Sequence, residues 1–289
     1  MIIFSYLNVS NPSNLEADSG FIFQKLLLQS ILEINQNFYA YLLCPKNTPF
    51  IHKRVKNIQI FKNSCNKYSV RFNFPWFKYI ELSFLKNVDI AIINQPELTS
   101  NFRSLFTVLG NRKVKIISYF HYIPIEKLPV KNRIFWEQSM NHNNLAQIIF
   151  KRQLEALITA DYCITCSRFA IKFLKENIKT IGEKVNFKKL TYIPPPISLE
   201  EVLENKTEEK FPLKTIVYNH RLYKHYGTTE IFDWLSELFT KRKDFQVLVT
   251  DPTFKRSRER NILNPDVERF KKYIGKLPFV KITHIKKAF

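Results

Sequence analysis

The chain alternates short apolar runs with longer stretches whose apolar residues recur at helical spacing. The runs predict buried strands, and the stretches predict helices. We expect strands at 1–9, 38–43, 55–61, 88–94, 114–120, 160–165, 191–193, 216–218, 245–250 and 280–283. We expect helices at 21–34, 102–109, 144–160, 168–177, 228–241 and 266–275, and a helical turn toward the end of 68–84. Because strands and helices alternate, the pattern predicts an α/β protein with parallel, doubly wound sheets.

The stretch from Pro194 to Lys210 divides the chain. It contains three consecutive prolines followed by a charged run, which is typical of a linker. We therefore expect a complete Rossmann-like domain at 1–205 and a second domain at 212–289 that begins afresh with a βαβαβ pattern.

No stretch of the sequence is long and apolar enough to predict a membrane span. The N-terminus has a short apolar segment and lacks the basic start of a signal peptide. These features predict a cytoplasmic protein, so any membrane role would be peripheral.

The charge balance is unusual. Among 289 residues there are 45 Lys and Arg against 25 Asp and Glu, a formal net charge of +20. Such a surplus favours a polyanionic partner, either a nucleic acid or an anionic membrane surface. A compositional bias toward Lys, Asn, Ile and Phe, as AT-rich coding produces, is the alternative explanation.

The four cysteines include a C-x-x-C pair, Cys163 and Cys166, inside a predicted strand. Alternate side chains of a strand point to opposite faces, and no second pair stands at zinc-site spacing. We expect reduced, mostly buried thiols and no metal, in an intracellular protein.

The stretch 215–234 carries the strongest chemical signal. A short apolar strand leads into the loop Asn219–Gly227, and a helix follows whose start Thr228 or Thr229 can cap. α/β proteins present phosphorylated ligands with such a unit. Arg221 offers a planar fork for two phosphate oxygens, and Lys224 adds a point charge. The alternative is a surface loop with two solvated cations.

Several short stretches together resemble the GT-B glycosyltransferases, especially the retaining family 4 type. They are the strand ending at His121, the segment from Ala160-Asp161 to Ser167, the three prolines, and Tyr-Asn-His-Arg221-Leu-Tyr-Lys224. The Asn-His-Arg sequence is similar to enzymes that mannosylate queuosine in tRNA. The layout is more loosely similar to phage enzymes that glucosylate hydroxymethylated DNA bases. The resemblance implies two Rossmann-like domains, with an acceptor site in the first domain and a nucleotide-sugar site in the second.

The resemblance also implies roles for particular residues. A UDP- or GDP-sugar donor would be bound by Gly20, Asn219, His220, Arg221 and Lys224, with no permanent cofactor. His121, Arg221 and Lys224 are the catalytic candidates. His121 would lie near the sugar, and the two cations would stabilise the leaving diphosphate, where negative charge builds.

Each assignment has a plainer alternative. His121 can be a structural histidine, His220 can pack behind the loop, Gly20 can serve an ordinary turn, and Ser167 is favoured as a helix cap. A single glycine follows the first strand where a dinucleotide fingerprint needs three, which argues against NAD. The chain has no Asp-x-Asp, so we expect metal-independent chemistry.

The second domain is shorter than the resemblance requires. In GT-B glycosyltransferases, an acidic motif contacts the donor sugar and ribose. That motif belongs to the part of the second domain that has no counterpart in this sequence. The chain is then a fragment, or a partner chain completes the domain, or the donor site is built differently.

The acceptor is predicted from basic residues interleaved with aromatic ones. The densest such stretch is Lys67–Tyr79, where aromatic rings could stack on bases while cations hold phosphates. The alternative for this stretch is an amphipathic helix or hairpin that packs on the core. A second basic cluster is Lys255–Arg260. We favour a nucleic-acid acceptor, either a modified DNA base or a tRNA. The alternatives are a peripheral membrane enzyme acting on lipid or surface polysaccharide, and a non-catalytic nucleic-acid-binding protein or subunit of a split enzyme.

Overall fold

The computed structural model describes residues 1–6, 19–44, 52–59, 74, 76–136, 144–194, 213–218, 222, 227–250 and 265–283. The chain folds into two compact units, unit 1 at Met1–Leu199 and unit 2 at Glu200–Phe289. Each unit has its own parallel sheet, and unit 1 contains three hydrophobic core clusters whereas unit 2 contains one.

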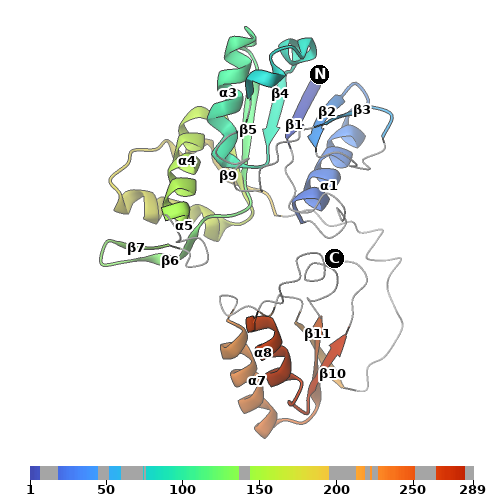
Figure 1. Ribbon diagram of the computed structural model, residues 1–289, viewed down its shortest axis with the longest axis vertical. Coiled ribbons are helices and arrows are strands. Elements are labelled where there is room, and N and C mark those ends of the chain that lie inside the picture. The colour runs from blue at the N-terminus through green and yellow to red at the C-terminus, as the bar shows by residue number, and fades with distance from the viewer. Residues whose placement is uncertain are drawn as a thin grey trace. The chain divides into compact units, whose positions relative to one another are not determined.

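Unit 1 contains a seven-stranded parallel sheet in the order β3-β2-β1-β4-β5-β8-β9 (Figure 1). Its strands are β1 Ile2–Tyr6, β2 Tyr39–Cys44, β3 Val55–Gln59, β4 Ile90–Ile93, β5 Lys115–Phe120, β8 Tyr162–Thr165 and β9 Leu190–Tyr192. Its α-helices are α1 Ser19–Ile34, α3 Thr99–Val108, α4 Leu145–Thr159 and α5 Arg168–Thr180. The predicted α/β class with parallel sheets is confirmed.

Two helices cover opposite faces of the central strands because side chains alternate along each strand. Ile3, Leu42 and Ile92 face α1 and form one core with Phe21 and Leu28. On the other face, a second core holds the side chains Phe4, Tyr6, Ile93, Phe102 and Phe106, the last two from α3. A third core surrounds α4 and α5 and includes Phe120, Phe150, Cys163 and Phe173.

A β-hairpin that the sequence pattern missed follows β5. Its strands are β6 Ile125–Val130 and β7 Arg133–Trp136, and its turn residues Lys131 and Asn132 both have positive φ. Register shifts interrupt the pairing on both sides of Lys127. Pro129 also lies in β6 and has no amide hydrogen for a ladder bond. The regular alternation that predicts strands is therefore absent, and the Lys-Asn turn was the remaining signal.

One further expectation needs correction. The stretch expected to turn helical toward residue 84 forms two 3-10 turns, Trp76–Tyr79 and Ser83–Asn87, rather than an α-helix. Pro96–Leu98 is a third such turn, and it leads directly into α3. The first part of the basic-aromatic stretch, 67–73, lies outside the described residues, as does the basic cluster 255–260.

Unit 2 has a three-stranded parallel sheet in the order β10-β11-β12. Its elements are β10 Lys214–Tyr218, α7 Thr228–Lys241, β11 Phe245–Thr250, α8 Pro265–Ile274 and β12 Val280–Thr283. Tyr218, Val247 and Val249 pack with Phe232 of α7 and Phe270 of α8, so both helices share a core with the sheet (Figure 1).

Candidate functional site

The strand order of unit 1 creates a switch point between β1 and β4. From β1 the chain proceeds to β2 and β3 on one side, and it then crosses back to add β4 and β5 on the other side. In open α/β sheets, ligands bind at the carboxyl ends of the strands at such a point. The candidate site of unit 1 is therefore the edge where β1, β4 and β5 end and α1 begins.

Two of the predicted site residues, Gly20 and His121, lie at this edge. Gly20 lies in the first turn of α1, and its carbonyl oxygen accepts a hydrogen bond from the side-chain amide of Asn94 at 3.5 Å. His121 follows the last residue of β5 and is exposed. Asn94, which the sequence pattern did not single out, directly follows β4 and bonds Gly20 of α1.

His121 is held against an aromatic pair. Its ring lies edge-on to Phe23 of α1, with centroids 4.8 Å apart, and to Tyr119 of β5, with centroids 4.1 Å apart. Phe23 and Tyr119 stack on each other at 4.0 Å. The exposed imidazole thus has a packed support, which limits the positions it can adopt.

A group of residues at this edge, which we call the switch-point cluster, shares the α1 face of the sheet. Its members are Gly20, Phe23, Gln24, Asn94, Tyr119 and His121. Gln24 donates a hydrogen bond from its amide to the hydroxyl of Ser5 in β1. Burial, with a smaller contribution from Cys166, raises the pKa of Tyr119 to about 12, so its phenol stays protonated at neutral pH.

The predicted donor residues Asn219, His220, Arg221 and Lys224 all lie outside the described residues. Their positions in the chain are bracketed by described elements, since β10 ends at Tyr218 and α7 begins at Thr228. Leu222 is 1% exposed and belongs to the core of unit 2. The predicted strand and helix are present on either side of this stretch, and the assignment of the four polar residues stays a prediction.

The start of α7 differs from the expectation that a threonine caps it. The N-cap is Gly227, with φ of 68°, and no side chain makes a capping bond. The Thr228 hydroxyl is instead 3.0 Å from the Tyr218 hydroxyl in the core. Glu230 does lie in the first turn, where the helix dipole favours an anion.

The segment from Asp161 to Ser167 is structural. Asp161 accepts hydrogen bonds from the Ile116 amide at 2.9 Å and from Arg103 at 2.6 Å, at the amino end of β8 and away from the candidate site. Ser167 accepts a hydrogen bond from the Ala170 amide at 3.1 Å, which confirms it as the cap of α5.

Cys163 is buried, and burial raises its pKa to about 12, so the thiol stays protonated. Cys44 is also a buried free thiol, whereas Cys166 is half-buried. Within the described part of the chain, no three His, Cys, Asp or Glu side chains gather in a way that would hold a metal ion.

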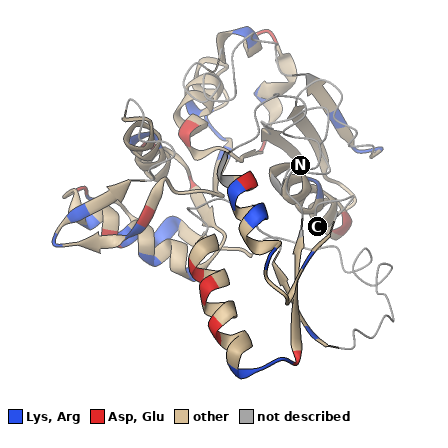
Figure 2. Cartoon of the chain, turned by 60° about the horizontal axis from the view of Figure 1, so that its bottom comes forward, with Lys and Arg blue, Asp and Glu red and all other residues tan. Residues whose placement is uncertain are grey.

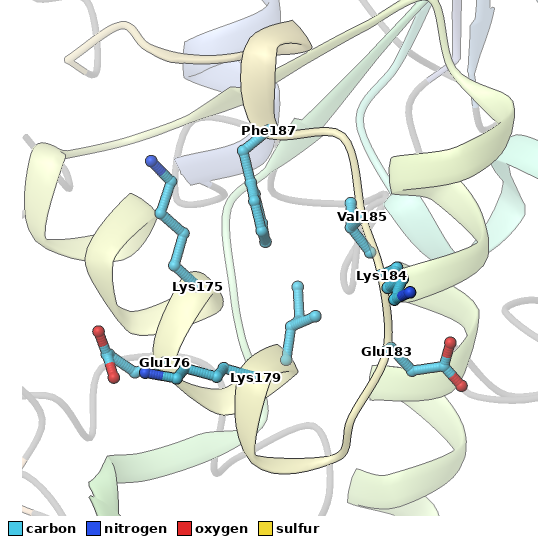
Figure 3. Close-up of a pocket in the computed structure, with 8 residues that line it drawn as sticks. Lys175, Glu176, Lys179, Glu183, Lys184, Val185 and Phe187 are labelled. Atoms are coloured by element: carbon cyan, nitrogen blue, oxygen red, sulfur yellow. The ribbon is translucent and has the colours of Figure 1, made fainter.

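A shallow pocket of about 440 Å³ lies on a different part of unit 1 (Figure 3). It is lined by lysines and glutamates at the end of α5 and just after it, together with Phe187. Because α5 runs back from the carboxyl edge of the sheet toward the start of β9, its last turn lies at the opposite edge from His121. This pocket is therefore separate from the switch-point cluster.

Comparison with known proteins identifies the fold. No protein-family model and no curated protein sequence matches the chain. Solved structures do match. HepE from Anabaena, solved with UDP and glucose, has a TM-score of 0.55 at 10% identity, over 98% of this chain and 68% of that one. The lipopolysaccharide outer core galactosyltransferase WaaB has a TM-score of 0.54 at 17% identity, over 99% and 68%. The trehalose-6-phosphate synthase OtsA has a TM-score of 0.56 at 13% identity, over 100% and 74%.

The chain therefore has a GT-B fold, built from two Rossmann-like domains of which the second is abbreviated. At these identities the similarity shows the fold alone. The same fold also occurs in a protein of different chemistry, a putative UDP-N-acetylglucosamine 2-epimerase from Listeria monocytogenes with a TM-score of 0.51. Among the helices that the structure describes, none has the length and apolar content to cross a bilayer.

Proposed function

We propose that this protein is a glycosyltransferase that moves a sugar from a nucleoside-diphosphate sugar to a hydroxyl acceptor. The observation that carries the proposal is the GT-B fold of the whole chain together with the cationic sequence Asn-His-Arg-Leu-Tyr-Lys between β10 and α7. The fold supports nucleotide-sugar chemistry, and the sequence supplies groups suited to a diphosphate.

In the proposed reaction, the acceptor oxygen forms a bond to the anomeric carbon. The bond from that carbon to the β-phosphate oxygen breaks, the nucleoside diphosphate leaves, and the hydroxyl proton of the acceptor passes to an oxygen of that leaving diphosphate. Arg221 and Lys224 would stabilise the charge that gathers on the leaving diphosphate. We assign donor binding to unit 2, including Asn219 and His220, with UDP or GDP as the nucleotide.

Unit 1 would hold the acceptor, with His121 at the carboxyl edge of its sheet near the reacting sugar. Gly20, which the sequence assigned to the donor, would border the same edge. No Asp-x-Asp stands in the sequence, so we propose that side-chain cations take the role that a metal has in enzymes with that motif. The family 4 assignment and the similarity to tRNA-queuosine mannosyltransferases remain part of this proposal.

Thermal shift tests donor binding. A nucleotide that binds only the folded state must raise the melting temperature. We expect UDP or GDP to raise it for the wild type and to have little effect on Arg221→Ala. Lys272→Ala is the matched control, because Lys272 is an exposed cation on α8 of the same unit. The proposal fails if neither nucleotide shifts the wild type, or if Arg221→Ala and Lys272→Ala respond alike.

The net positive charge of the chain supports a polyanionic partner, and the helix α5 presents a surface to which such a partner could bind. On α5 the exposed cations Arg168, Lys172, Lys175 and Lys179 recur at spacings of three and four residues, which places them on one face. By contrast, Glu230, Asp233 and Glu237 run along the exposed side of α7 (Figure 2). We propose that a nucleic acid or an anionic membrane surface would approach the α5 stripe.

A further inference from the structure

Three polar atoms of the switch-point cluster are buried without a hydrogen-bond partner. They are the side-chain carbonyl oxygens of Gln24 and Asn94 and the hydroxyl of Tyr119. The three residues are 0%, 6% and 1% exposed. Buried polar atoms are normally hydrogen-bonded, and exceptions in a folded protein point to a function or a missing partner. Ten such side-chain atoms occur among the described residues, and three of them come together here, from α1, the end of β4 and β5.

A hydrogen bond and a ring stack tie these residues to one corner of unit 1. The amide of Asn94 bonds the Gly20 carbonyl at 3.5 Å, and Gly20 begins the same helix that carries Gln24. The Tyr119 ring stacks on Phe23, the residue before Gln24. All three unpartnered atoms therefore belong to residues that surround the first two turns of α1, beside the exposed His121.

The chemistry of these atoms selects their ligand. An amide carbonyl oxygen only accepts hydrogen bonds, so the partner of Gln24 or Asn94 must bring a donor. Phosphate oxygens also accept hydrogen bonds, so a phosphate group would be repelled by these carbonyl oxygens. The Tyr119 phenol, which stays protonated, can donate or accept. Hydroxyl groups satisfy both kinds of site, because each hydroxyl donates one hydrogen bond and accepts others.

The composition of the cluster agrees with a neutral ligand. Its six members, all of them described residues, include no Lys, Arg, Asp or Glu, although the chain as a whole carries a formal charge of +20. Recognition of a nucleic acid relies mostly on cations at its phosphates. The cluster offers aromatic rings and neutral polar atoms instead, the combination typical of pockets that hold small polar molecules.

We propose that the switch-point cluster binds the hydroxyl groups of a neutral saccharide, which serves as the acceptor. Asn94 accepts a hydrogen bond from one sugar hydroxyl, Tyr119 bonds a second, and the ring of His121 flanks the sugar. The role of the saccharide as acceptor rests on the proposed function. Saccharide binding by the cluster does not depend on it. The polyanionic partner of the α5 stripe is then a separate interaction from acceptor recognition.

Tyr119→Phe tests the proposal because it keeps the aromatic stack and removes only the unpartnered hydroxyl. Asn94→Ala is the second variant, and Tyr162→Phe is the matched control, since Tyr162 is 56% exposed on the neighbouring strand β8. The probes are methyl glycosides of the common hexoses and a single-stranded oligonucleotide. Their dissociation constants would be measured by ligand-observed NMR with UDP present and absent.

We expect at least one methyl glycoside to bind the wild type and Tyr162→Phe equally. Loss of one hydrogen bond should weaken its binding by about 3- to 10-fold in Tyr119→Phe and in Asn94→Ala. The melting temperature of Tyr119→Phe should be no lower than that of the wild type, because the Tyr119 hydroxyl has no hydrogen-bond partner to lose. The proposal is overturned if no glycoside binds, if the variants bind as tightly as the wild type, or if only oligonucleotide binding responds to these substitutions.

Failure of the proposed function gives a different result. If UDP and GDP leave the melting temperature unchanged while glycoside binding depends on Tyr119, the cluster is a saccharide site of a protein that is not a nucleotide-sugar enzyme. If UDP or GDP binds and glycoside binding does not depend on Tyr119, the function stands and this inference falls.

Discussion

Asp161 illustrates how a residue in a suggestive motif can have a structural role. Arg103 donates to Asp161 at 2.6 Å and to the Thr159 carbonyl at 3.0 and 3.2 Å, and Lys115 lies 3.6 Å from the same carboxylate. Burial by itself would raise the pKa of Asp161, but the hydrogen bonds from Ile116 and Arg103 and the nearby charges outweigh it and lower the pKa. The carboxylate thus joins α3, β5 and the start of β8.

Asp161→Asn should lower the free energy of unfolding by about 1–3 kcal/mol at neutral pH, since it weakens hydrogen bonds to a charged group. A depressed pKa means that the stabilisation is present above the ordinary aspartate pKa, about 3.9, and is lost as the pH falls through the folded-state value. Urea unfolding between pH 3 and pH 7 would measure it. A wild-type advantage that is unchanged across that range would contradict this account.

Asp244 provides the comparison for that experiment. It accepts from Arg242 at 2.6 Å and lies 3.0 Å from Lys214, and these partners hold its pKa well below the ordinary value. All three side chains are largely exposed, so solvent screens the interaction. We expect Asp244→Asn to leave the unfolding midpoint nearly unchanged, in contrast to Asp161→Asn.

At the scale of the element, the entry to α7 depends on one backbone conformation. Gly227 has φ of 68°, a left-handed value, and this conformation sets the direction in which α7 starts. No side-chain cap compensates for a change at this position.

Gly227→Ala should therefore destabilise unit 2 by about 1–2 kcal/mol, the cost of a left-handed conformation for a residue with a Cβ atom. Gly227→Asn should cost less, because asparagine tolerates this region better. Hydrogen exchange of the α7 amides would show the effect, with the amides of α1 in unit 1 as internal control. Equal protection of α7 in all three proteins would refute the prediction.

For the molecule as a whole, the exposed charge differs from one described helix to another. The helix α5 exposes four cations, whereas α7 exposes acidic residues and ends in the basic run Lys241, Arg242 and Lys243 (Figure 2). Net charge by itself predicts attraction to any polyanion. Because the exposed charges differ between helices, we expect the attraction of a polyanion to depend on particular helices.

Replacing Arg168, Lys172, Lys175 and Lys179 together with glutamine should weaken binding to heparin or to an oligonucleotide. The slope of log K against log salt should fall by roughly 0.7–0.9 for each phosphate that the variant no longer neutralises. The matched control removes the same charge by replacing the exposed Lys53, Lys56, Lys86 and Lys113 with glutamine. If both quadruple variants lose affinity equally, the α5 stripe has no special role and net charge alone explains the binding.

The hydrophobic pattern of the sequence is enough to predict the fold class and most of the elements. Runs such as Ile90–Ile93 and Phe245–Thr250 are apolar because parallel strands are buried on both faces, so the pattern predicts them without a structure. It also placed Ser167 as a cap and His121 at the end of a strand, because both signals are local. The hairpin after β5 escaped prediction, since its bulged pairing breaks the alternation.

Which distant residues come together depends on how the strands pair in the folded chain. Gln24, Asn94 and Tyr119 are separated by long stretches of sequence and have no shared motif, and glutamine, asparagine and tyrosine are individually unremarkable. The strand order β2-β1-β4-β5 brings the ends of β4 and β5 beside the start of α1, and burial then leaves three polar atoms without partners. Local pattern cannot reveal such a site, because it arises from the order in which strands pair and not from the order in which residues follow one another.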